Sequence, residues 1–363
     1  MVITLFTITE TLFVFIIGII IAMVPYMTEK SVIFGVRIPL EYINSNTVNK
    51  MKKTYLFIVL ILTAIFTVIT LITPYIFIIS LMPLFIIIVE FMVYLPEHYR
   101  LKKIKSSEHW IMNGNVNENK ITGIFNTEKA KFPWFFGIPG ILITISIFIT
   151  GLLYYKNIPH KFATHFNANG VPNAYSIKSI GSVFILGFIS IVTTAMIILL
   201  AYAIYKTSLK TDNASSNGEK KAMLFRERMV YTVLLIPAFI NSTLLISSFQ
   251  MWGILKKNIL VDLIPIFLMV VLVLVVSFKT GQLGSNIKID NDNKVSNNSD
   301  DDSLWKAGVL YYNKNDTRMM VPKRFGVGYT INFGRPVGLV IFILLISIPV
   351  IVVIITFISA GII

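Results

Sequence analysis

Hydrophobic residues occur along this chain in eight long, uninterrupted runs, and polar segments rich in Lys, Asn and Ser separate them. A helix that crosses the hydrocarbon core of a bilayer needs about 20 apolar residues. The strands of a transmembrane barrel are only about ten residues long and alternate apolar with polar positions, so these runs exclude them. The pattern predicts transmembrane helices over residues 3–25, 54–73, 75–96, 136–155, 180–205, 229–252, 259–278 and 337–360.

The composition agrees with a chain that lies mostly in lipid. Hydrophobic residues make up 55% of the chain and charged residues only 14%, whereas about a quarter of an average soluble domain is charged. The first run lacks a basic residue before its apolar core and a small-residue cleavage site after it, so we expect a retained helix rather than a signal peptide. The expected fold class is an all-α polytopic membrane protein with a small β-rich cytoplasmic segment.

Lys and Arg are distributed unequally between alternate loops. Loops one, three, five and seven hold 27 of the 32, and loops two, four and six hold the other five. Because basic residues concentrate on the cytoplasmic side of a membrane, the odd-numbered loops are expected inside and both termini outside. Orientation and attraction to anionic lipid account for the net charge of +14, so the lipid bilayer is an expected partner and nucleic acid is not.

Side chains that support catalysis or metal binding are scarce. The chain has no cysteine, which excludes disulfides, thiolate metal sites and cysteine nucleophiles. His160 and His165 lie five residues apart, which does not match the spacing of zinc ligands on a helix. Gly326-Val-Gly328 lacks the following glycine and lysine of a phosphate loop. We therefore expect no catalytic residue, no metal and no cofactor, and a membrane enzyme is the least favoured alternative.

The loop at 157–179 is the strongest candidate for recognition outside the cell. Asn and Gly tolerate positive φ, and Pro172 stops an extended segment, so Asn167–Gly170 is expected to reverse the chain and bring His165 close to Tyr175. The candidate recognition residues in this loop are His165, Asn167, Gly170, Tyr175 and Lys178.

The first inner loop carries the sequence Gly35-Val-Arg37-Ile-Pro39, and Arg37 is a further recognition candidate. Pro39 favours an extended conformation at Ile38. The alternative interpretation is an interfacial loop whose cations reach toward the lipid headgroups. Ser45 is expected to cap a short helix that follows.

Acidic residues lie within or near three of the apolar runs, at Glu10, Glu90 and Asp262. Intramembrane ionisable residues are functional candidates, and the helix interiors contain no Lys or Arg to pair with them. Glu90 and Asp262 lie near helix ends, where they can reach the interface, so Glu10 is the favoured candidate.

The segment at 281–336 changes character along its length. Residues 286–303 are poor in apolar side chains and are expected to be disordered. Val309–Tyr312 and Met319–Val321 are expected to form a hairpin, with Tyr329–Phe333 as a third strand. The expected regions are 1–133, 134–206 with the outer loop, 207–280, the cytoplasmic segment 281–336, and the last helix at 337–363.

Two stretches resemble a known family. The outer loop, with Ile158-Pro159, His165-Phe-Asn167, Gly170, Pro172, Tyr175 and Lys178, resembles a small domain of unknown function in SdpI-type bacterial immunity proteins. Gly35–Pro39 resembles the Gly-Ile-Arg-Thr-Pro segment of the same proteins, although there it follows the outer loop. Residues 305–326 resemble an uncharacterised C-terminal domain that often accompanies the first.

This resemblance implies a bacterial plasma-membrane protein that senses, or confers immunity to, an envelope-active agent such as a peptide toxin. The basic inner loops are expected to report to, or recruit, a cytoplasmic regulator as a further partner. The alternative expectation is a small-solute or ion-coupled transporter that uses Glu10 and the proline-bearing helices around Pro83, Pro237 and Pro265.

Overall fold

The computed structural model describes residues 5–110, 131–167, 170–207, 216–289 and 300–340, together with 342, 343 and 347. The chain forms two compact units. Unit 1 comprises Met1–Lys129, Thr207–Arg226 and Ser277–Val340, and unit 2 comprises Ala130–Lys206, Glu227–Val276 and Ile341–Ile363.

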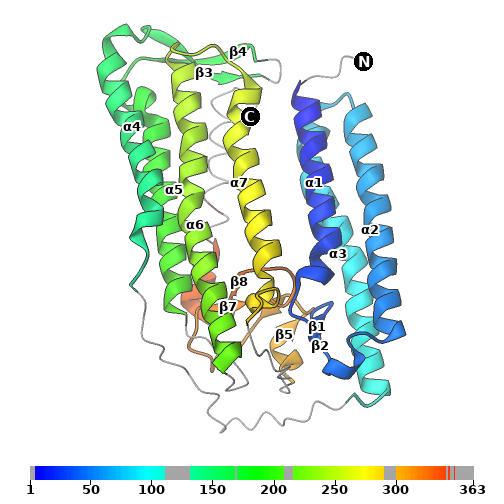
Figure 1. The fold of residues 1–363 in the computed structure, drawn as a ribbon. Coiled ribbons are helices and arrows are strands. Elements are labelled where there is room, and N and C mark those ends of the chain that lie inside the picture. The colour runs from blue at the N-terminus through cyan, green and yellow to red at the C-terminus, as the bar shows by residue number, and fades with distance from the viewer. Residues whose placement is uncertain are drawn as a thin grey trace. The chain divides into compact units, whose positions relative to one another are not determined.

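The described residues contain seven helices that are long and apolar enough to cross a membrane, as the hydrophobic pattern predicts (Figure 1). Their bounds are α1 Leu5–Met27, α2 Asn46–Ile72, α3 Ile76–Ser107, α4 Ile138–Tyr154, α5 Ile180–Lys206, α6 Ser216–Met251 and α7 Ile259–Thr280. The protein is an all-α polytopic membrane protein with small β hairpins. The eighth predicted helix, at 337–360, lies mostly outside the described residues.

Helix α2 begins at the predicted cap, because the backbone N–H of Val48 donates to Oγ of Ser45 at 3.3 Å. The prediction that this helix is short is wrong. No Gly or Pro interrupts the residues between Ser45 and the apolar run, so one continuous helix extends to Ile72.

Within the described residues, four two-stranded antiparallel sheets accompany the helices. Unit 1 contains β1 Val32–Ile33 with β2 Val36–Arg37, β5 Trp305–Lys306 with β6 Leu310–Tyr311, and β7 Met320–Pro322 with β8 Tyr329–Ile331. Unit 2 contains β3 Lys161–Phe166 with β4 Pro172–Ile177.

The predicted hairpin between Val309–Tyr312 and Met319–Val321 is wrong, although strands do form within both segments and within Tyr329–Phe333. Strand β6 pairs with β5, and β7 pairs with β8. A local turn accounts for the difference. Ala307 and Gly308 adopt positive φ and close the first hairpin within three residues, so β6 finds its partner before β7 is reached.

Candidate functional sites

The loop between α4 and α5 folds back on itself as predicted. The backbone N–H of Gly170 donates to the carbonyl of Asn167 at 2.9 Å, and the N–H of Val171 donates to Oδ1 of Asn167 at 3.0 Å. Gly170 has a φ of +75°, a conformation that glycine adopts without steric cost. Asn167 and Gly170 therefore act as turn-forming residues at the tip of the β3–β4 hairpin.

One face of this hairpin packs against the helical core of unit 2, and the other face is exposed. Phe162 is buried in a core cluster with Phe184 and Trp252. On the exposed side, Nζ of Lys161 lies 5.2 Å from the ring centroid of Tyr175, whose residue surface is 52% exposed. The core contacts hold the hairpin in place while an aromatic and cationic surface faces away from it.

His165 makes its polar contact with Asn173 rather than with Tyr175. Nδ1 of His165 faces Oδ1 of Asn173, and because an amide oxygen only accepts, the ring nitrogen is the donor. A register shift beside His165 places it opposite Ala174, while Tyr175 lies opposite Ala163. The sequence did not indicate Asn173, because only the strand register brings it to His165.

Lys178 holds the base of the hairpin. Its backbone N–H donates to the carbonyl of His160 at 2.8 Å, and Nζ donates to the carbonyl of Ile158 at 2.9 Å. The same ammonium lies 4.8 Å from the ring centroid of Tyr155. These contacts make Lys178 a positioning residue for the loop.

Asp262 has a cationic partner, although the helix interiors contain no Lys or Arg to pair with it. Its carboxylate forms an ion pair with Lys257 and accepts a hydrogen bond from Nε2 of Gln250 at 2.8 Å. Lys257 also lies 5.4 Å from the ring centroid of Phe166 in β3. Lys257 comes from the turn before α7, outside the helix interiors in which the sequence analysis sought a partner.

The burial of the two other acids reverses their expected ranking. Glu90 on α3 is fully buried, and Oγ1 of Thr63 donates to its Oε1 at 3.0 Å. The other oxygen, Oε2, has no hydrogen-bond partner within the described part of the chain. Glu10 is only partly buried. Glu90 is therefore the more deeply buried acid and replaces Glu10 as the favoured intramembrane candidate.

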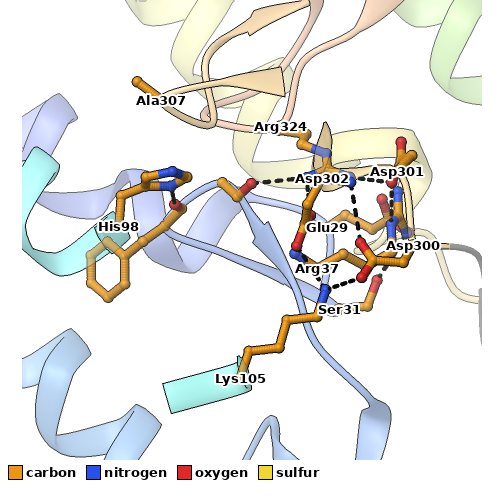
Figure 2. Close-up of polar contacts among 12 residues, drawn as sticks. Glu29, Ser31, Arg37, His98, Lys105, Asp300, Asp301, Asp302, Ala307 and Arg324 are labelled. Carbon is orange, nitrogen blue, oxygen red and sulfur yellow. Dashed lines mark hydrogen bonds and ion pairs between the residues drawn. The ribbon is translucent and has the colours of Figure 1, made fainter. Parts of the chain in front are cut away.

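In unit 1, Arg37 lies in a cluster of ion pairs formed by distant parts of the chain (Figure 2). Nε of Arg37 donates to Oδ1 of Asp301 at 3.0 Å, and its backbone N–H donates to Oδ1 of Asp302 at 3.1 Å. Its Nη1 lies 3.2 Å from Oε1 of Glu29. The Arg37 side chain is 7% exposed, so these carboxylates neutralise a nearly buried charge.

Two further cations complete the cluster. Arg324 pairs with both Asp301 and Asp302. Lys105, from the end of α3, lies 2.7 Å from Oδ2 of Asp300 and 2.7 Å from Oδ2 of Asp302. Each carboxylate of Asp300–Asp302 therefore has a cationic partner that holds it in place. The prediction of disorder across 286–303 is wrong for these three residues.

The cluster sets the ionisation of its carboxyl groups. Burial acts to raise the pKa of Asp301, but the nearby Arg37 and Arg324 outweigh it and lower the pKa to about 2. The pKa of Asp302 is also lowered, because Arg324 and Lys105 outweigh the effect of burial. Both groups are anionic throughout the physiological pH range.

Two glycine turns pack against each other beside the cluster. Phe34 and Gly35 have φ values of +45° and +71°, and the turn at Ala307 and Gly308 has +50° and +70°. The hydroxyl of Tyr94 lies 3.0 Å from the carbonyl oxygens of both Phe34 and Ala307. The sequence Gly-Val-Arg-Ile-Pro thus forms a docking turn for the C-terminal segment.

Sequence reasoning missed most of this cluster. Its members other than Arg37 are Glu29, Lys105, Asp300, Asp301, Asp302 and Arg324. One signal was present: three consecutive aspartates in a chain with only 18 acidic residues against 32 basic ones. Low apolar content instead led to the prediction of disorder.

Two stretches of the chain are similar to known families. Residues 141–191, which include the β3–β4 hairpin, match a family described as a domain of unknown function (DUF1648). Residues 314–339, which include Arg324, match a family of unknown function (DUF5808). No curated protein and no solved structure matches the chain. Both descriptions fit an uncharacterised membrane family and leave the activity open.

Proposed function

We propose that the protein is a non-enzymatic, SdpI-like protein of the bacterial plasma membrane that senses or confers immunity to an envelope-active agent, such as a peptide toxin. The observation that carries the proposal is the β3–β4 hairpin, which is fixed by one face and exposes Lys161 and Tyr175 on the other. A surface aromatic beside a cation suits recognition of a partner from solution. The match to the domain of unknown function spans this hairpin.

The proposed roles divide between the two units. The hairpin recognises the agent through His165 and Tyr175, while Asn167, Gly170 and Lys178 hold its shape. Unit 1, with Arg37 in its ion-pair cluster, communicates with a cytoplasmic regulator. The proposal includes no catalytic step and no metal.

Toxin challenge of a deletion strain complemented with hairpin variants tests this proposal. Gly170→Val should abolish protection because a β-branched residue is strongly disfavoured at positive φ, and His165→Ala should reduce it. His160→Ala is the matched control and should have a milder effect. Immunoblots must show equal membrane levels. Full protection by all variants, or protection that disappears with EDTA and returns with zinc, would contradict the proposal.

A small-solute or ion-coupled transporter is the second candidate, and the burial of Glu90 favours it. On the Pro83-bearing helix α3, the Glu90 carboxyl is fully buried, and one of its oxygens has no hydrogen-bond partner among the residues that the structure describes. Such a group is typical of an ion or proton pathway. If transport is the function, Glu90→Gln should reduce solute uptake into vesicles at least about tenfold, whereas Glu10→Gln should have little effect. Unchanged uptake in Glu90→Gln would exclude this role for Glu90.

A further inference from the structure

The ion-pair cluster of unit 1 brings together three nearly buried cations. The side chains of Arg37, Lys105 and Arg324 are 7%, 10% and 3% exposed. They come from β2, from the end of α3 and from the segment after β7, and they face the same small region (Figure 2). Buried cations that converge in this way need anions to offset the loss of hydration.

A short acidic run of the chain supplies most of those anions. Asp301 accepts from both guanidinium groups, and Asp302 accepts from Arg324, Lys105 and the backbone N–H of Arg37. Asp300 to Ser303 have no apolar side chain to bury, so ion pairs hold this segment in place. Outside this run, Glu29 supplies a further carboxylate, which pairs with Arg37.

The hydrogen-bond donors around Asp300–Asp302 are of the kinds that proteins use to bind phosphate. Two guanidiniums, one ammonium and a backbone N–H converge on adjacent carboxylates. Arg324 is further held 5.3 Å from the ring centroid of Trp305. Its Nε is buried and has no hydrogen-bond partner in the described part of the chain, so the carboxylates leave one donor of the site unused.

We propose that Arg37, Lys105 and Arg324 form a binding site for a phosphate group, and that Asp301 and Asp302 occupy this site in cis. A phosphate presents more oxygens than a carboxylate and can engage the unused donor of Arg324. The site lies in unit 1, so it does not depend on recognition by the hairpin of unit 2. An external phosphate must compete with carboxylates that are tethered at a high local concentration.

Thermal unfolding of the full chain in neutral detergent, followed by tryptophan fluorescence, tests the proposal. Sodium phosphate is titrated against sodium chloride at constant ionic strength. Phosphate should raise the midpoint of Asp301→Asn/Asp302→Asn in a saturable way, and the wild type should need at least about tenfold more phosphate for the same shift. Adding Arg324→Gln to the double variant should abolish the response, while Glu41→Gln, an exposed charge removal, should behave as wild type.

Several outcomes would overturn the proposal. They are equal responses in wild type and double variant, a chloride response as large as that of phosphate, and a response that survives Arg324→Gln. Asp302→Asn alone serves as the test protein if the double variant does not fold. Reconstitution in phosphatidylglycerol or phosphatidylcholine vesicles separates the sources: selective stabilisation by phosphatidylglycerol without added phosphate identifies a lipid headgroup, and stabilisation by soluble phosphate alone identifies a free ligand.

Discussion

At the residue scale, the two docked turns of unit 1 depend on the absence of side chains at Gly35 and Gly308. A Cβ atom on Gly308 would lie 2.5 Å from the Tyr94 hydroxyl, 2.8 Å from Nδ1 of His98 and 2.9 Å from Cα of Gly35. Contacts this short require the turns to separate. The sequence shows these glycines, but it does not show that they meet, because they are 273 positions apart along the chain.

We therefore expect Gly308→Ala to destabilise the protein by about 2–3 kcal/mol, since it adds a steric clash to the cost of positive φ. Gly326→Ala is the matched control, because Gly326 has a φ of +88° but nothing within 4 Å of an added Cβ. The control should lose only about 1 kcal/mol. Equal losses in thermal unfolding would show that the turns do not need their close approach.

Asp316 gives a pH-dependent prediction at the same scale. Burial acts to raise its pKa, but hydrogen bonds and charge from Arg318 outweigh burial and lower the pKa to about 2. The ordinary value is 3.8, so the carboxylate stabilises the fold fully above about pH 4 and loses this contribution as the pH falls toward 2. The contribution is roughly 2 kcal/mol.

The measurement is the difference in stability between wild type and Asp316→Asn as a function of pH. The difference should be large at pH 6 and should shrink steadily between about pH 4 and pH 2. A difference that stays constant over this range would show that the charge on Asp316 does not stabilise the fold.

At the element scale, the helices were predictable and the strand partners were not. A spanning helix carries its own signal, because its backbone hydrogen bonds are local and its apolar length is set by the bilayer. The reversal at Asn167–Gly170 was predictable for a similar reason, since turn residues act over a few positions. In contrast, the strands of unit 1 are two or three residues long, and such short apolar segments have several possible partners.

One buried side chain illustrates what decided the actual pairing in unit 1. Asn332 is fully buried, and its amide donates to the carbonyls of Asn313, Asp316 and Arg318 at 2.9–3.2 Å. These bonds hold the 313–319 segment as a loop beside β8, so it does not act as the turn of a β6–β7 hairpin. A single Asn in the sequence gives no sign of three such partners.

At the scale of the whole molecule, the candidate sites also differ in how far the sequence predicts them: local features are predictable, and contacts between distant residues are not. The hairpin lies within one local stretch, and the sequence located it. The ion-pair cluster joins residues as far apart as Arg37 and Asp301, so only the folded chain brings its charges together. Local composition alone assigned Asp300–Asp302 to a disordered segment, because the cations that fix it lie elsewhere in the sequence.

The charge distribution predicts the orientation of the molecule in the membrane. With 27 of 32 Lys and Arg residues in the odd-numbered loops, the hairpin tip at Asn167 should face outside. Asn213 and Asn297, which lie outside the described residues, should face the cytoplasm. The chain has no native cysteine, so single cysteines at these three positions can be labelled one at a time in intact cells. A membrane-impermeant maleimide should label position 167 directly, and positions 213 and 297 only after permeabilisation. Labelling of 213 but not of 167 in intact cells would invert the topology and place the hairpin inside, where it cannot meet an agent that arrives from outside.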